Sequence, residues 1–254
     1  MIFLRSLLFN IAFYVNIIAW MIIISPTLLG PRPFFFKAVG AWVKSSLWLM
    51  RVIAGIRVEI RNPEKIPQGP AIVAAKHQSF LETFVLVGCL GDPVIILKRE
   101  LTWIPLFGWY LQKARMIPVN RGARARALED ATLRTRAEMA TGRQLLIFPE
   151  GTRRAPGAPP NYKFGVAYIY DTVKFPVTPV GLNTGLFWPR REFIRRPGTA
   201  VVEFLDAIPT GLGREEVLAE ISARIEESSD RLLAEGLAEL GPLAPRIDRG
   251  ATPA

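Results

Sequence analysis

The chain has 254 residues, half of them hydrophobic and 21% charged, which suits one α/β domain, alone or with an anchor, and excludes disorder for most of the chain. One cysteine, Cys89, and one histidine, His77, exclude disulfides within the chain, cysteine-rich metal sites and any mechanism that needs two histidines. The net charge is +10, and residues 1–205 alone carry +15. This charge suits an anionic partner: a membrane, a phosphorylated substrate or an acidic protein. Nucleic acid is not favoured, because the sequence has no helix-turn-helix, zinc-finger or RNP pattern.

The N-terminal segment is predicted to be a membrane anchor. No charged residue lies between Arg5 and Arg32. A helix from about Leu7 to Leu29 would run roughly 35 Å, enough to cross a hydrocarbon core of roughly 30 Å. The apolar region is too long for a signal peptide, and no small-x-small cleavage pattern follows it.

A second apolar stretch follows at residues 33–55, after turn signals at Pro26 and Gly30–Pro31. Its basic residues recur every seven positions, as Lys37, Lys44 and Arg51, and on a helix they share one face. This pattern is typical of a helix at a membrane surface. Three arrangements stay open: a spanning first helix with an interfacial second one, a hairpin in one leaflet, or a buried hairpin of a soluble protein. Basic residues flank both ends of the first stretch, so they do not fix its orientation.

The remaining chain alternates between strand and helix patterns, which predicts an α/β fold with a mostly parallel sheet flanked by helices, preceded by the N-terminal apolar two-helix membrane anchor. We expect strands at residues 56–62, 70–77, 93–100, 115–121, 143–152, 175–183 and 199–209. We expect helices at residues 79–90, 103–114, 123–142, 162–172 and 214–240. The predicted organisation is an anchor over residues 1–53, a domain over 54–241 and a flexible tail over 242–254.

The segment KHQSFLET (76–83) ends a predicted strand and opens a helix. His77 therefore lies at the carboxyl edge of the sheet, where open α/β sheets bind ligands. Glu82, one helical turn further on, could hold one ring nitrogen and leave the other free as a base. Ser79 and Glu82 also match the capping box S-x-x-E, in which Glu82 only accepts a backbone N–H. Both interpretations stay open from this segment alone.

The segment FPEGTR (148–153) follows another predicted strand. Gly151 allows close approach of the backbone to a ligand, and Thr152 and Arg153 are residue types that hold phosphate, arginine through a forked contact. A surface turn with solvated charges is the alternative.

Together these segments resemble the membrane glycerolipid acyltransferases, in particular the bacterial 1-acyl-glycerol-3-phosphate (lysophosphatidate) acyltransferases. The four blocks that carry the resemblance are His77 with Glu82, LKRELTWIPLFGW (97–109), FPEGTR, and VTPVGLN (177–183) with Pro179. They occur in family order within residues 70–185. Two positions depart from the family pattern, since Glu82 stands where aspartate is usual and Lys76 where asparagine is frequent.

The resemblance implies an α/β fold, no metal or cofactor, and transfer of an acyl chain from acyl-CoA or acyl carrier protein to the sn-2 hydroxyl of lysophosphatidate, giving phosphatidic acid. Under it, His77 is the general base and Glu82 orients it. Substrate-binding roles fall to the following residues: Lys98, Arg99, Glu150, Gly151, Thr152, Arg153 and Pro179.

Within that set, Arg153 with Lys98 or Arg99 would hold the substrate phosphate, Glu150 would order Arg153, and Pro179 would shape the pocket wall. The apolar side chains of the second block line an acyl tunnel or pack in the core. We expect the protein at the bacterial inner (cytoplasmic) membrane, anionic on its surface, with the catalytic domain on the cytoplasmic side. Two other functions stay open: acylation of another lyso-lipid, such as a lyso-ornithine lipid, and a non-catalytic membrane adaptor.

Overall fold

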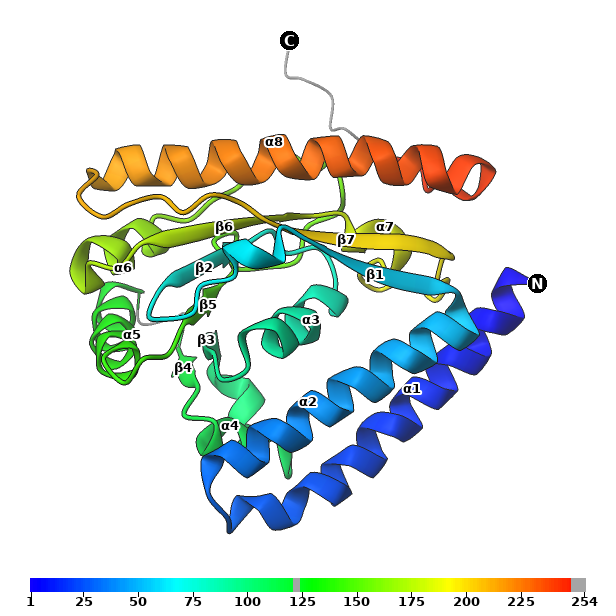
Figure 1. Cartoon of the computed structure of the whole chain (residues 1–254), viewed down its shortest axis with the longest axis horizontal. Coiled ribbons are helices and arrows are strands. Elements are labelled where there is room, and N and C mark those ends of the chain that lie inside the picture. The colour runs from blue at the N-terminus through cyan, green and yellow to red at the C-terminus, as the bar shows by residue number, and fades with distance from the viewer. Residues whose placement is uncertain (121–123, 248–254) are drawn as a thin grey trace.

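The computed structural model describes residues 1–120 and 124–247 (Figure 1). The helices are α1 (Ile2–Ile24), α2 (Arg32–Leu49), α3 (Leu81–Leu90), α4 (Phe107–Lys113), α5 (Arg124–Met139), α6 (Gly165–Val173), α7 (Thr184–Phe187) and α8 (Arg214–Leu240). The strands are β1 (Ile56–Arg61), β2 (Ile72–Ala75), β3 (Val94–Lys98), β4 (Ile117–Val119), β5 (Leu145–Ile147), β6 (Val177–Leu182) and β7 (Gly198–Phe204). Short 3₁₀ turns form η1 (Ser25–Leu28), η3 (Pro63–Lys65), η4 (Arg99–Trp103) and η6 (Gly241–Leu243), and η2 (Met50–Ala54) is a π turn.

Every element expected from the sequence is present, with shorter strands than the patterns suggested. Residues 121 and 123 of the expected strand and helix, and residues 248–254 of the expected tail, lie outside the described part of the chain. The short helix α7 was not anticipated.

The strands form one sheet in the order β1-β7-β6-β2-β5-β3-β4. All neighbouring strands are parallel except β6 and β7. The prediction of a mostly parallel α/β fold is confirmed. Because β2, β3 and β5 run in the same direction, their carboxyl ends meet at one edge of the sheet, where the loops that follow them can form a single site.

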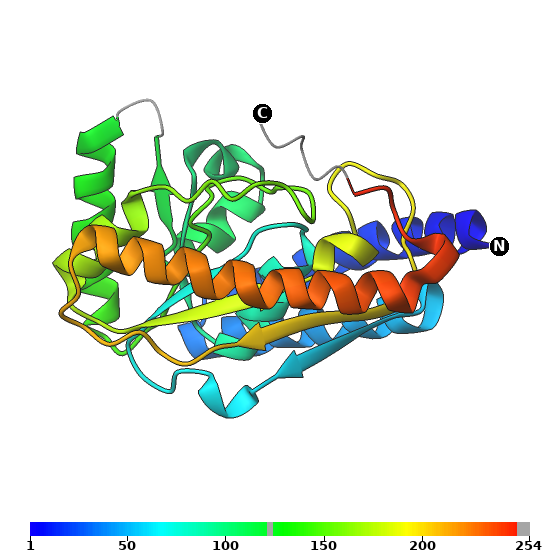
Figure 2. The ribbon, with the colours of Figure 1, turned by 90° about the horizontal axis from the view of Figure 1, so that it is seen from above.

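Helices cover both faces of this sheet. Figure 1 shows α8 on one side, and α3 with the pair α1 and α2 on the other. In Figure 2, seen from above, α8 lies in front of the sheet and the pair α1 and α2 behind it. Strand β2 is buried on both faces: Ile72 and Ala74 join the apolar cluster of α5, α6 and α8, while Val73 and Ala75 join that of α1 and α3. The alternation explains why its sequence is an unbroken apolar run, as is usual for a central strand of a parallel sheet.

The N-terminal helices pack against the domain and against each other. α1 begins at Ile2, earlier than expected, and its α-helical turns end at Ile24 because Pro26 has no backbone N–H to donate. Phe9 and Phe13 are almost fully buried, and the Phe13 ring lies 4.8 Å from that of Trp188, centroid to centroid. The helix pair therefore shares the hydrophobic core of the α/β domain.

The outer side of α1 is apolar and exposed. Within the described residues, Ile2–Leu28 is the one segment long and apolar enough to cross a membrane, with mean hydropathy 2.3, and 17% of its most apolar window is buried. The exposed side chains of α1 include Leu4, Leu8, Ile11, Val15, Ile18 and Ile22. The predicted basic stripe is exposed beside Phe34 and Trp48, with Lys37 and Lys44 on α2 and Arg51 in η2. This surface argues against the alternative of a hairpin buried inside a soluble protein.

Candidate active site

His77 lies in the loop between β2 and α3, at the carboxyl edge of the sheet as predicted. Its Nδ1 is 2.8 Å from Oε1 of Glu82, which is fully buried in the first turn of α3. Because a carboxylate only accepts hydrogen bonds, Nδ1 is the donor in this contact, and Nε2 is the ring nitrogen left to act as a base. The sequence interpretation of His77 and Glu82 as a base and its orienting acid fits this geometry.

Glu82 also makes the capping contacts that formed the competing interpretation. Its Oε1 accepts the backbone N–H of Gln78 at 2.8 Å and of Ser79 at 2.7 Å. Its Oε2 accepts the hydroxyl of Thr184 at 2.6 Å. Four donors therefore meet the two oxygens of the fully buried Glu82. The two interpretations are therefore compatible, because one side chain does both.

One face of the His77 imidazole packs against the third block. The rings of His77 and Phe148 are stacked, with centroids 4.0 Å apart and planes 21° apart. The backbone N–H of Arg154 donates to the carbonyl of His77 at 2.8 Å. The His77 side chain is 15% exposed, so one part of the ring still faces the outside. Packing and hydrogen bonding thus fix the ring plane and leave an accessible edge.

The residues after Phe148 form a tight turn with two arginines. Gly151 has φ +66°, in the left-handed region that glycine adopts without strain. The Arg153 guanidinium lies 5.8 Å from the ring centre of Phe80, which directly precedes α3. Arg190 donates to the carbonyl of Arg153 at 2.9 Å and lies 3.4 Å from the hydroxyl of Thr152. Arg190 was missed from the sequence, since no motif marks the loop after α7.

Glu150 does not hold Arg153 as expected. Its Oε1 lies 3.6 Å from Nε of Arg154 and 3.7 Å from Nζ of Lys76, and the carboxyl is almost fully buried. Burial raises the pKa of Glu150; Lys76 opposes this effect, and the charge of Glu226 reinforces it. The expectation for Arg153 was wrong because its neighbour Arg154 points inward and takes the place beside the acid.

Lys76, which departs from the family pattern, is buried beside Glu150. It also pairs with Glu226 of α8, which accepts the hydroxyl of Tyr162 at 2.7 Å. Burial raises the pKa of Tyr162, and its hydrogen bond to Glu226 adds to the effect. A buried lysine needs such partners, since an unpaired charge there would cost several kcal/mol.

The other predicted binding residues lie further from His77. Lys98 and Arg99 are exposed at the carboxyl end of β3, which is two strands from β2, or roughly 10 Å at ordinary strand spacing. Pro179 is buried inside β6, opposite Ala74. Trp103 and Trp109 are 69% and 59% exposed, so these tryptophans of the second block are not core residues.

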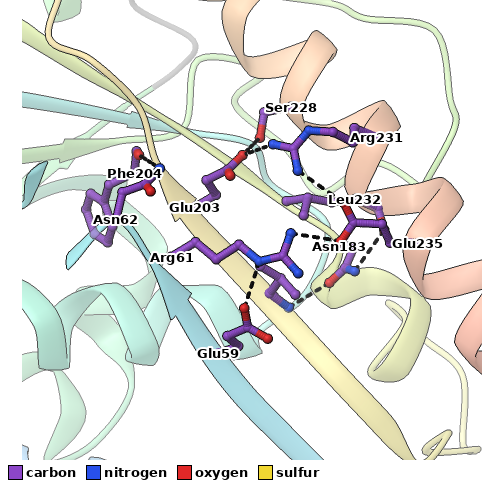
Figure 3. Close-up of polar contacts among 11 residues, drawn as sticks. Glu59, Arg61, Asn62, Asn183, Glu203, Phe204, Ser228, Arg231, Leu232 and Glu235 are labelled. Atoms are coloured by element: carbon purple, nitrogen blue, oxygen red, sulfur yellow. Dashed lines mark hydrogen bonds and ion pairs between the residues drawn. The ribbon is translucent and has the colours of Figure 1, made fainter.

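Thr184 is the positioning residue that sequence reasoning missed. It follows Asn183, whose side chain accepts the Val201 N–H at 2.8 Å and donates to the Leu232 carbonyl at 2.9 Å (Figure 3). Around it, Arg61 bridges Glu59 and Glu235 at 2.7 and 2.8 Å. These contacts connect β1, β7 and α8, and so fix the start of α7. A hydroxyl after a strand carries too little sequence signal to be singled out.

Cys89 does not contribute a nucleophile to this site. It lies at the end of α3, half-buried, and burial raises the pKa of its thiol to about 11. The thiol is therefore protonated at neutral pH, as a structural cysteine is.

Comparisons with known proteins point to one family. A family model described as Acyltransferase matches residues 57–183, which include His77, Glu82 and the third block. The chain is 32% identical over 247 residues to a 1-acyl-sn-glycerol-3-phosphate acyltransferase of Pseudomonas aeruginosa, covering 96% of this chain and 94% of that one. It is 27% identical over 185 residues to the human 1-acyl-sn-glycerol-3-phosphate acyltransferase beta, covering 71% and 65% of the two chains.

The fold has a counterpart among solved structures. The crystal structure of the 1-acyl-sn-glycerophosphate (LPA) acyltransferase PlsC from Thermotoga maritima matches with a TM-score of 0.79 and 22% sequence identity, covering 92% of this chain and 98% of that one. The match extends over nearly the whole of both chains. With a family model over half of its length and a bacterial relative over almost all of it, this chain belongs to the acyltransferase family.

Proposed function

We propose that the protein transfers an acyl chain from an acyl thioester to the sn-2 hydroxyl of 1-acyl-glycerol-3-phosphate, giving phosphatidic acid for phospholipid synthesis. The observation that carries the proposal is the 2.8 Å contact between His77 and the buried Glu82. His77 is the one histidine of the chain, and it lies at the sheet edge as a base. Relatives in the same family carry this activity in their names.

The chemistry follows from the ring nitrogen of His77 that Glu82 leaves free. Nε2 of His77 takes the proton of the acceptor hydroxyl, and the oxygen attacks the thioester carbonyl to form a tetrahedral oxyanion. Glu82 stabilises the imidazolium that forms, because its charge lies against Nδ1–H. When the intermediate collapses, the C–S bond breaks and His77 returns the proton to the leaving thiolate. No covalent acyl-enzyme is needed.

The acceptor phosphate is assigned to the turn after Phe148. Arg153 leans over Phe80 at the start of α3, close in the chain to the His77 loop, and offers a planar donor fork. Arg190 lies against Thr152 and supplies a second cation. Lys98 and Arg99 lie two strands away, so we assign them to the outer part of the headgroup or to the donor.

The acyl donor carries its chain on CoA or on acyl carrier protein. Both carriers are anionic, and residues 1–205 carry a net charge of +15. The charge attracts either of them and does not discriminate.

We place the protein on one leaflet of the bacterial inner membrane, with the α/β domain on the cytoplasmic side. The support lies at the two ends of α1. Near its start, the hydroxyl of Ser6 accepts the backbone N–H of Arg195, between α7 and β7, at 2.9 Å. Near its end, the Met21 carbonyl accepts the hydroxyl of Tyr110. A helix attached to the same domain at both ends lies along that domain, whereas a spanning helix would carry one end to the opposite side of the bilayer.

The test is thioester-dependent acylation of lysophosphatidate by the purified full-length protein in lipid vesicles. Acyl-CoA and acyl carrier protein are supplied separately, and a lyso-ornithine lipid is compared as acceptor. Phosphatidic acid formed by the wild type and not by His77→Ala supports the proposal. Faster turnover of the phosphate-free acceptor would reassign the enzyme to the alternative substrate, and no acylation of either lipid would favour the adaptor.

A further inference from the structure

An apolar patch lies outside the site, on η4 and the first turn of α4. Its members are large side chains that are 36% to 69% exposed. They are Leu101, Trp103, Ile104, Phe107 and Trp109, and we call them the η4–α4 patch. Two exposed tryptophans within seven residues are uncommon on a soluble surface, where large apolar side chains occur singly.

The backbone under the patch is built for this shape. Leu106 has φ +62°, a left-handed conformation that is strained for a residue with a side chain. A Cβ atom on Gly108 would lie 2.1 Å from the carbonyl oxygen of Thr102, so only glycine fits there. The N–H of Gly108 donates to the carbonyl of Ile104 at 2.8 Å. A tight turn with these constraints holds its apolar side chains outward instead of letting them fold into the core.

The turn is also attached to the tip of the N-terminal hairpin. Nζ of Lys113 donates to the carbonyls of Leu28 and Gly30, at 2.9 and 2.5 Å. Tyr110 is 7% exposed, packs near Phe35 and donates its hydroxyl to Met21. Figure 1 shows α4 beside the point where α1 turns into α2. The η4–α4 patch therefore lies next to the tip of the hairpin, where Leu29 is exposed.

The charge around the patch fits an anionic lipid surface. Residues 98–115 contain four basic residues and one acidic residue. Lys98 directly precedes η4, and Arg99 is its first residue. Tryptophan is the residue that membrane proteins place at the level of lipid headgroups, because its ring is apolar and its N–H is polar. An apolar surface bordered by lysine and arginine is the combination that binds membrane interfaces.

We propose that the η4–α4 patch inserts into the same membrane leaflet as α1, as a second contact that sets the tilt of the catalytic domain on the bilayer. With this contact, Lys98 and Arg99 lie at headgroup level on the route from the lipid surface to His77. The inference rests on the proposed membrane attachment and not on the proposed reaction.

The test measures depth in the bilayer at one residue. A Cys89→Ala protein carries Ile104→Cys, labelled with a small environment-sensitive fluorophore. The full chain is reconstituted in phosphatidylethanolamine–phosphatidylglycerol vesicles that contain lipids with a quencher near the headgroup. The matched control is Leu133→Cys in the same background, because Leu133 is 58% exposed on α5 and lies outside the patch.

Interfacial side chains sit about 5–10 Å into the headgroup boundary, so we expect at least about twofold stronger quenching at position 104 than at 133. Equal quenching at the two positions would overturn the proposal. Loss of quenching on adding acyl-CoA would show that the patch binds the acyl chain instead. Quenching that varies with the protein-to-lipid ratio would show that the patch binds a second copy of the protein. The same depth in a His77→Ala background separates this result from failure of the proposed reaction.

Discussion

The hydroxyl of Thr184 donates to Oε2 of Glu82 at 2.6 Å, although 102 residues separate them in the chain. This contact joins the first block of the site to the residue that follows the fourth. Oε1 of Glu82 contacts His77 while Oε2 reaches α7, so the acid is held between two segments of the fold.

His77→Ala should lower the rate of acyl transfer at least about 10²–10⁴-fold, the range that a general base contributes. The chain has no second histidine to replace it. Binding of the protein to vesicles should stay unchanged, because the His77 side chain is far less exposed than the outer face of α1. The measurement is initial rate with lysophosphatidate, with vesicle flotation as the control. Turnover close to that of the wild type would remove His77 from the mechanism.

Glu82→Gln should reduce kcat at least about tenfold, because the negative charge that stabilises the imidazolium in the transition state is lost. The amide oxygen can still accept the N–H groups of Gln78 and Ser79, so the start of α3 should be retained. The measurement compares kcat with the thermal unfolding midpoint. A parallel fall of both would show that Glu82 acts as a cap alone.

Thr184→Val is the matched control for this experiment. It keeps the Glu82 charge and removes only one donor, which costs about 1–3 kcal/mol at a buried group. We expect a smaller fall in kcat than for Glu82→Gln and a larger change in unfolding midpoint. We expect these two results because the Thr184 hydroxyl only positions Glu82, whereas the Glu82 carboxylate supplies the charge beside His77.

Arg153→Ala should raise KM for lysophosphatidate by about 10- to 100-fold, the value of a charge-assisted contact of about 1.5–3 kcal/mol. KM for the thioester should change little. Arg190→Ala is the companion variant. It should raise KM for lysophosphatidate less, because part of the Arg190 hydrogen bonding is used to hold the carbonyl of Arg153. A rise confined to the thioester would reassign Arg153 to the donor.

Glu150→Gln should stabilise the protein more at neutral pH than at pH 4.5. Burial raises the native pKa of Glu150, so the folded chain binds this proton more tightly than the unfolded one, in which the pKa is about 4.3. The native state therefore loses stability as pH rises from that value through the raised pKa. The glutamine variant lacks this loss. The test is the unfolding midpoint of the variant and the wild type at pH 4.5 and 7.5, with Glu64→Gln as the control at an exposed position. An equal difference between variant and wild type at both pH values would contradict the prediction.

The sequence predicted the elements because their signals are local. Apolar runs mark β2 and β5, and the S-x-x-E pattern marks the start of α3 near Glu82. Strand order and the antiparallel pairing of β6 with β7 depend on contacts between distant segments, which a pattern does not contain.

Within the site, the contact of His77 with Glu82 was predictable because five residues separate them across a loop and one helical turn. Thr184 and Arg190 come from a loop without a motif, so only the folded chain brings them to the site. The choice between Arg153 and Arg154 as partner of Glu150 depended on which of two adjacent side chains points inward. Backbone geometry decides that, and composition does not.

The final prediction concerns how α1 meets the membrane. Deleting residues 1–53 would be an ambiguous test, because it removes Phe9, Phe13 and Met50 from the core. Topology can instead be read from the intact chain by placing single cysteines at Leu4 and Ile22, near the two ends of α1, in a Cys89→Ala protein.

Both ends of α1 are attached to the α/β domain, Ser6 through the backbone N–H of Arg195 and Met21 through Tyr110. In sealed vesicles with the domain outside, a polar thiol reagent should therefore reach neither position from the lumen, and any labelling should come from outside at both ends. A lipid-soluble reagent should label both, because Leu4 and Ile22 lie on the exposed apolar side of the helix. Labelling of one end from the lumen alone would show that α1 spans the bilayer. The attachment of its two ends to one domain would then be broken in the membrane.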